Sequence, residues 1–181
     1  MAKVTQLDIP ELKSKLKDYD QKELIRLIAE LYEQYDDVQH HLSDKLSRNE
    51  TISELYEETK EEIEGEFHTD NGFGKLRSAK VKKAINNFKK AAKDHKKTLD
   101  LMLYYVEIGT TFTNTYGDID GKFYGDMESM YEKVVTACEK DEDLFNDLQE
   151  RLYAVVINSE NIGWGYHDSI KELYYSIRVG R

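Results

Sequence analysis

The chain of 181 residues carries a net charge of −10 at pH 7, which argues against nucleic acid or an anionic membrane as its main partner, because bulk negative charge repels phosphate. Its single cysteine, Cys138, excludes an internal disulfide and a cysteine metal cluster. Hydrophobic residues make up 39% of the chain, but 13 Tyr and 6 Phe supply large side chains for a core, so a packed fold is predicted rather than a disordered one.

Two amphipathic helices are predicted at the N-terminus. Asp8 is a candidate cap, and the only proline, Pro10, lies in the first turn of a short helix that ends near Asp18. Asp20 is followed by Glu23 at the spacing of a capping box, which opens the second helix. The apolar stripe of this second helix consists of Leu24, Ile25, Leu27, Ile28, Leu31, Tyr32 and Tyr35.

Two further helices are expected before the first glycine-rich segment. The aspartate pair at 36–37 predicts the start of a helix through Leu46, and a separate helix is expected from Asn49 to Phe67. The polar side of the latter is strongly acidic. Residues 68–74 contain Asp, Asn and two glycines, which predicts a loop.

A strongly basic segment follows. Residues 75–97 contain ten lysines and arginines against one acid, and Ser78 to Asp94 has the apolar periodicity of a helix. One interpretation is a phosphate-binding face. The other is that the basic face lies beside the acidic helix of residues 57–66, so that opposite charges partly neutralise each other. The basic face consists of Lys80, Lys83, Lys90 and Lys97.

The central helix is predicted to run from Thr98 to Tyr116 and to be buried. Its first half, residues 99–108, has only two charged residues, and Gly117 is a natural C-cap. Three more helices are expected after it. They begin with a cap at Asp126, with the acidic triplet at 141–143, and, after a loop at 158–165, near Tyr166, the last ending near Arg178.

These patterns predict an all-α fold. About eight helices joined by short loops favour antiparallel pairs packed into a compact bundle or a short superhelical stack, and we expect residues 1–181 to form a single domain. The N-terminus lacks the apolar run of a signal peptide, and no segment reaches the roughly 20 apolar residues of a membrane span. A reduced, cytoplasmic protein is therefore expected.

Three segments of the chain are distinctive. They read LKSKLKDYDQKELIRLIAELY near the N-terminus, DLMLYYVEIGTTFTNTYGDIDGKFYGDMESMYEKV in the middle and IGWGYHDSI near the end. Together they resemble a family of small bacterial proteins that carries only a domain-of-unknown-function label. The resemblance implies an all-helical fold, and it implies no activity because the family offers no catalytic residue, ligand or partner to carry over.

Polar and aromatic residues gather in two predicted loops and on the central helix. If the loops meet, carboxylates, an imidazole and aromatic rings would line one cleft for a small polar ligand or an acid-base pair. The same residues could instead be turn formers, helix caps and core plugs. The candidates are Glu107, Asn114, Tyr116, Asp118, Asp120, Trp164, Tyr166, His167 and Asp168.

Three functions remain open at this stage. The leading interpretation is a non-enzymatic module that binds a protein, peptide or small ligand around the two loops, with a homo-oligomer also possible. The alternatives are an enzyme that uses Asp118, Asp120 and His167 with a divalent metal, and nucleic-acid binding through residues 80–97. No calcium loop or zinc motif is complete, so neither a metal site nor a cofactor is assigned, and no membrane partner is expected.

Overall fold

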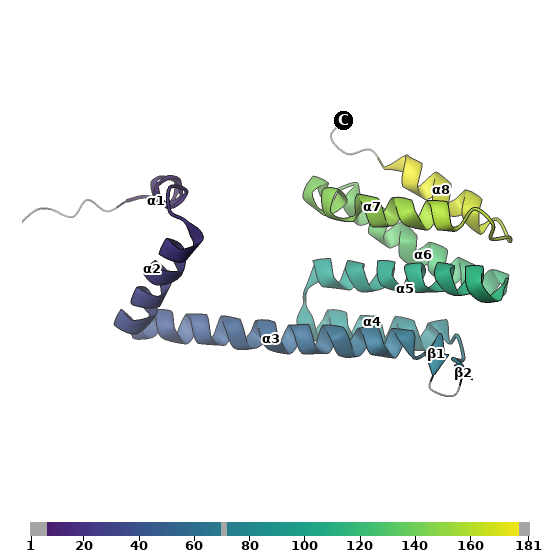
Figure 1. Cartoon of the computed structure of the whole chain (residues 1–181), viewed down its shortest axis with the longest axis horizontal. Coiled ribbons are helices and arrows are strands. Elements are labelled where there is room, and N and C mark those ends of the chain that lie inside the picture. The colour runs from purple at the N-terminus through teal and green to yellow at the C-terminus, as the bar shows by residue number, and fades with distance from the viewer. Residues whose placement is uncertain (1–6, 70–71, 178–181) are drawn as a thin grey trace, which may run out of the picture. The chain divides into compact units, whose positions relative to one another are not determined.

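The computed structural model describes residues 7–69 and 72–177, and these contain eight helices and one two-stranded hairpin (Figure 1). The predicted all-α fold is confirmed. The predicted end of the last helix at Arg178 lies outside the described residues. The helices are α1 (Ile9–Leu16), α2 (Gln21–Gln34), α3 (Asp36–Glu64), α4 (Ser78–Ala92), α5 (His95–Tyr116), α6 (Gly121–Cys138), α7 (Glu142–Asn158) and α8 (Tyr166–Ser176).

The chain divides into two compact units between Thr51 and Ile52, within α3, and each unit is described by itself. In the N-terminal unit both predicted helix starts are confirmed. The Asp8 carboxylate accepts the amide of Glu11 at 2.8 Å. Asp20 and Glu23 form a reciprocal capping box, in which each side chain accepts the other residue's amide at 2.8 Å. These caps satisfy amides that have no partner within the helix.

The helix break expected between Leu46 and Asn49 is wrong, because α3 is continuous through this segment. No glycine or proline occurs there, and the polar residues that suggested a loop fit a solvent-exposed helical turn. The Thr51 hydroxyl donates to the carbonyl of Ser47 at 3.1 Å, as it would on any helix surface. The break lies earlier, at Tyr35, whose extended backbone separates α2 from α3.

The predicted loop at 68–74 is a minimal antiparallel hairpin. Strand β1 (His68–Thr69) pairs with β2 (Gly72–Phe73), with His68 opposite Phe73. Gly74 follows the hairpin. Only glycine fits at this position, because a Cβ atom there would lie 2.1 Å from the carbonyl oxygen of Glu66. The hairpin therefore turns the chain sharply between α3 and α4.

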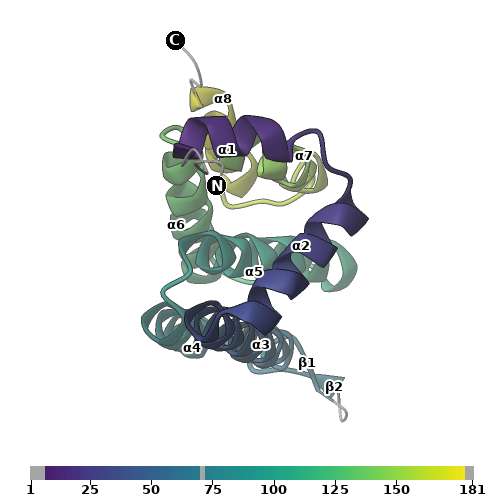
Figure 2. The ribbon, with the colours of Figure 1, turned by 90° about the vertical axis from the view of Figure 1, so that its left-hand side faces the viewer.

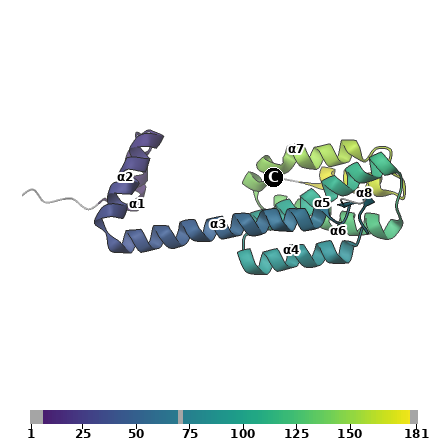
Figure 3. The same ribbon diagram turned by 60° about the horizontal axis from the view of Figure 1, so that its bottom comes forward.

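The C-terminal unit is built around α5, as predicted. Figures 1 and 2 show the second half of α3 beside α4 on one side of α5, and α7 and α8 on the other. No residue from Leu99 to Ile108 is exposed. Figure 3 shows the second half of α3 running alongside α4. Although α5 is largely buried, no helix in the described ranges has the length and hydropathy needed to cross a membrane.

The cap of helix α6 lies six residues earlier than predicted. Asp120, and not Asp126, caps it by accepting the amide of Phe123 at 2.8 Å, while Asp126 forms an ion pair with Lys82 of α4. Aspartates occur both at helix starts and on the polar side of amphipathic helices. The local sequence therefore did not show which of Asp120 and Asp126 is the cap. The predicted start of α7 is confirmed, since Asp141 accepts the amide of Leu144 at 3.0 Å.

Candidate functional site

The two predicted loops lie against each other at one end of α5. A Cβ atom built on Gly163 would lie 3.1 Å from Oδ2 of Asp118, and one built on Gly121 would lie 3.3 Å from the Trp164 ring. Asn114 at the end of α5 adds a link, because its side-chain amide donates to the carbonyl of Asn158 at 2.6 Å. We call the loops at 117–120 and 159–165, with Asn114 and His167, the loop cluster.

Asp118 is held in the loop cluster by a tyrosine of α6. The hydroxyl of Tyr124 donates to Asp118 at 2.9 Å and accepts the amide of Ile119 at 3.2 Å. Burial raises the pKa of this hydroxyl, so it remains a neutral donor. Asp118 is therefore a fixed carboxylate whose second oxygen faces Gly163.

His167 is oriented by the loop that precedes α8. Its Nδ1 lies 3.0 Å from the hydroxyl of Ser159, and this hydroxyl is buried and donates to the carbonyl of Val156 at 2.8 Å. Because the single hydroxyl proton is used on Val156, Nδ1 of His167 is the donor to Ser159. The hydrogen bond to Ser159 therefore fixes the orientation of the His167 ring.

Trp164 is the most exposed aromatic side chain of the loop cluster, with 66% of its surface accessible. Its φ of 60° lies in the left-handed region, which bulky side chains avoid. Gly165 follows with a φ of 74°, so two successive residues have this backbone conformation. The loop thus holds a large ring outward at a conformational cost.

Four of the nine sequence candidates lie outside the loop cluster, and two of them connect helices of the core. The Glu107 carboxylate accepts two hydrogen bonds from the Arg151 guanidinium, at 2.8 and 2.7 Å, and Arg151 also pairs with Asp100. Tyr166 is completely buried, with its hydroxyl 3.0 Å from that of Thr110. These residues join helices of the core. Asp120 is a helix cap, and the structure gives Asp168 no hydrogen bond or ion pair within the described residues.

Tyr116 packs on the hairpin instead of on the second loop. Its ring centroid lies 4.6 Å from that of Phe73, 4.8 Å from that of Phe112 and 6.1 Å from that of His68. A cavity of about 430 Å³ adjoins this aromatic group beside α5. The sequence contained a signal for it, because His68 and Phe73 flank the glycine-containing turn, but pairing across that turn was not predicted.

The basic segment has acidic neighbours on several elements. Glu66, only 1% exposed, accepts hydrogen bonds from Arg77 at 2.8 and 2.9 Å and pairs with Lys80 at 3.2 Å. Arg77 is the main reason that the pKa of Glu66 falls to about 2. Ion pairs also join Lys82 to Asp126 and Lys96 to Asp147, on helices that the charge pattern did not identify. Lys97 donates to Ser53 at 3.3 Å, while Lys83 and Lys90 are exposed.

The model of a family of unknown function, DUF6155, matches residues 8–177. The chain belongs to the DUF6155 family. The comparisons with curated proteins and with solved structures found no match. The family resemblance expected from the sequence is thus confirmed. Because the function of the DUF6155 family is unknown, membership does not assign an activity to this chain.

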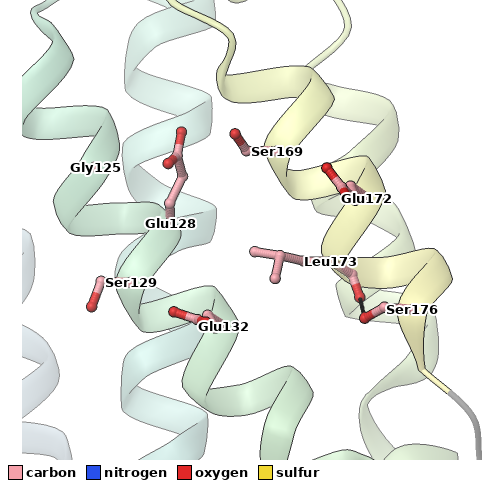
Figure 4. Close-up of a pocket in the computed structure, with 8 residues that line it drawn as sticks. All are labelled: Gly125, Glu128, Ser129, Glu132, Ser169, Glu172, Leu173 and Ser176. Carbon is pink, nitrogen blue, oxygen red and sulfur yellow. Dashed lines mark hydrogen bonds between the residues drawn. The ribbon is translucent and has the colours of Figure 1, made fainter.

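A cavity of about 460 Å³ lies between α6 and α8 of this DUF6155 chain. Figure 4 shows Glu128 and Glu132 on α6, Glu172 on α8, and Leu173 pointing into the gap between the two helices. Burial raises the pKa of Glu128. Within residues 7–69 and 72–177, no three His, Cys, Asp or Glu side chains are grouped closely enough to hold a metal ion.

The N-terminal unit presents a second candidate surface, which the sequence analysis did not single out. We call it the N-terminal apolar face, and it consists of Ile25, Ile28, Leu31, Tyr32, Leu42 and Leu46. Ile25, Ile28, Leu31 and Leu46 are 39–59% exposed. Two apolar cavities of about 330 and 360 Å³ adjoin each other here, and both are lined by Ile28 and Leu42. Periodicity predicted the stripe, but it does not tell whether the same chain covers it.

Proposed function

We propose that this DUF6155 chain is a cytoplasmic, non-enzymatic protein-interaction module that binds a protein partner through the N-terminal apolar face. One observation carries the proposal: none of the described residues from Leu7 to Thr51 is buried, although α2 is strongly amphipathic. A 14-residue helix is marginal by itself in water and usually needs a packed apolar face. Exposed apolar patches of this kind mark interaction sites.

The C-terminal unit differs from the N-terminal unit in having a buried core. It contains every fully buried large side chain of the described residues, including Tyr105, Tyr131 and Leu152. This unit therefore has a core of its own, and the N-terminal unit has none. The amphipathic helices of the N-terminal unit have no core beneath them. A partner that covers their apolar side would therefore stabilise them.

The chemistry of the described residues also favours binding over catalysis. The one cysteine, Cys138, is completely buried, and burial raises its pKa to about 11, so it is a thiol and a poor nucleophile at neutral pH. The carboxylates of Asp118 and Asp120 are used in a loop contact and a helix cap.

Site-specific photo-crosslinking in the native cell tests the proposal. We would place benzoylphenylalanine at Ile28 in the full chain and, as a matched control, at the exposed Lys89 of α4. We expect discrete protein adducts from position 28 and few from position 89. No adduct from position 28, or equal adducts from both positions, would overturn the proposal.

The loop cluster is a second candidate binding surface, and the exposed, left-handed Trp164 is the observation that favours it. We propose that Trp164, with Asp118 and His167, binds a peptide or a small polar ligand. Trp164 is the only tryptophan, so its emission reports on this surface directly. Titration with a library of short peptides should give a saturable change in emission, which Asp118→Asn weakens. An unchanged spectrum with every peptide would remove this candidate.

A further inference from the structure

We propose that the loop cluster binds an arginine side chain of a partner peptide, with the guanidinium group stacked on the Trp164 ring and paired with the Asp118 carboxylate. This inference rests on the second binding surface proposed above and names the chemistry of its ligand. It follows from an exposed ring and a neighbouring carboxylate, neither of which has a cationic partner within residues 7–69 and 72–177.

The Trp164 ring offers the kind of surface that attracts a cation. It meets Gly121 only through Cε3 and Cζ3 of its six-membered ring, which would lie 3.3 and 3.7 Å from a Cβ atom built on this glycine. Because the side chain is 66% exposed, this contact leaves most of the ring open to a ligand. Tryptophan binds cations more strongly than the other aromatic side chains. In the described ranges lysines lie over tyrosine rings of α3 and α5, but none lies over Trp164.

Asp118 supplies a carboxylate beside this ring. The hydroxyl of Tyr124 donates to Oδ1 of Asp118 at 2.9 Å and so holds the carboxylate in place. The other oxygen, Oδ2, faces Gly163, the residue that precedes Trp164, and a Cβ atom there would lie 3.1 Å from it. Glycine at position 163 therefore keeps Oδ2 accessible next to the ring, and among the described residues Asp118 forms no ion pair.

The charge around the ring is negative. The loop cluster contains Asp118, Asp120 and Glu160 but no lysine or arginine, and Asp168 follows in the first turn of α8. Lys122, in the first turn of α6, balances only one of these charges. The whole chain carries a net charge of −10, so its field also favours the approach of a cation over that of an anion.

The arrangement favours a guanidinium group over an ammonium group. A guanidinium group is planar, so it stacks on an indole ring while its edge donates to a carboxylate, whereas an ammonium group is a point charge. Both cavities described above for the C-terminal unit are lined by other residues, and small-molecule sites are concave. An exposed ring therefore fits a side chain presented by a partner peptide better than an enclosed small molecule.

A nuclear magnetic resonance titration of the full chain at low salt tests the inference. Trp164 is the only tryptophan, so the chain gives one indole N–H signal. The probes are four acetylated and amidated tripeptides whose central residue is arginine, lysine, citrulline or glutamate between two glycines. We expect the arginine peptide to shift the indole signal saturably below about 10 mM, and the lysine peptide to bind at least about threefold more weakly. The uncharged citrulline peptide and the glutamate peptide should not saturate in this range.

Substitutions assign the binding to the two residues. Asp118→Asn keeps an acceptor for Tyr124 but removes the charge, so it should weaken the arginine peptide at least about fivefold. Trp164→Phe should weaken it and Trp164→Gly should abolish its binding, as followed by the backbone amide of Gly163. Glycine at position 164 accepts the left-handed backbone, so this variant keeps the fold. Asp143→Asn, at the opposite end of α7 from the loop, is the control with a matched charge change and should bind within about twofold of the wild-type chain.

The outcomes separate this inference from the proposed binding surface. Equal binding of the arginine and citrulline peptides would overturn a cation as the ligand but retain the loop cluster as a binding surface. Equal binding of the arginine and lysine peptides would overturn the guanidinium group, and binding that survives Asp118→Asn or Trp164→Gly would overturn the site. If none of the four peptides binds, the inference is wrong, and the peptide library described above decides whether the surface binds another class of ligand.

Discussion

Gly109 shows how one residue sets the distance between two core helices. A Cβ atom at this position of α5 would lie 2.1 Å from Sδ of Met127 on α6, and Met127 is completely buried and has no solvent-facing alternative. We expect Gly109→Ala to reduce the free energy of unfolding by about 1–2 kcal/mol, since overpacking outweighs the gain in helix propensity. Urea denaturation measures the difference.

Gly125 of α6 is the matched control for this substitution. A Cβ atom there has no neighbour within 4 Å, so Gly125→Ala should stabilise the chain by about 0.5–1 kcal/mol through helix propensity alone. Equal effects of the two substitutions would show that the crossing of α5 and α6 tolerates an added methyl group.

Trp164 provides a test of strain at the loop cluster. Its left-handed backbone costs energy that a glycine does not pay, and the exposed ring contributes little burial. Trp164→Gly should therefore raise the free energy of unfolding by about 0.5–1 kcal/mol, which thermal unfolding detects. Lys93→Gly, at the left-handed end of α4, should give a similar gain. A loss of stability at Trp164 would mean that its contact with Gly121 outweighs the strain.

At the scale of elements, Glu66 connects the end of α3 to the start of α4. Its pKa of about 2 is below the usual 4.5, so the stabilisation is complete above pH 4.5 and is lost as the pH falls toward 2. We expect Glu66→Gln to cost up to about 3 kcal/mol at pH 7, because Arg77 and Lys80 lose their counter-charge. The cost should shrink between pH 5 and 3, as measured by urea denaturation at each pH.

A neighbouring acid serves as the control for Glu66. Glu62 lies in the last turn of α3, is exposed, and has no ion pair or side-chain hydrogen bond within the described residues, so Glu62→Gln should leave the pH dependence of the free energy of unfolding unchanged. A constant difference between the wild-type chain and Glu66→Gln from pH 7 to 3 would contradict a lowered pKa.

Local signals predicted helix starts well and helix joints less well. The caps at Asp8, Asp20 and Asp141 depend on residues three positions apart, which the sequence displays directly. The continuity of α3 and the choice of Asp120 over Asp126 depend on tertiary packing. Lys82 of α4 takes Asp126 as a partner across 44 residues of sequence, and no local pattern contains that information.

At the scale of the whole molecule, composition and periodicity predicted the buried α5, and they left open whether the two loops beside it meet. They did not predict which of the candidate site residues have a structural role. Glu107 lies opposite Arg151 and Tyr166 lies in the core, because helices distant in sequence supply their partners. Binding by the loop cluster stays a prediction. The N-terminal apolar face was visible as a stripe on α2, but periodicity could not show that the described part of the N-terminal unit has no buried residue of its own.

The unequal distribution of buried side chains makes a final prediction about independent folding. The described residues before Ile52 contribute no buried side chain, whereas the C-terminal unit has a continuous apolar core around α5. A fragment of residues 49–181 should therefore fold, with a melting temperature within a few degrees of that of the full chain. Circular dichroism and differential scanning calorimetry measure this, and a fragment of residues 1–51 alone should be largely unfolded, because its helices lack a core. Loss of cooperative melting in the longer fragment would mean that the N-terminal unit stabilises the core through contacts of its own.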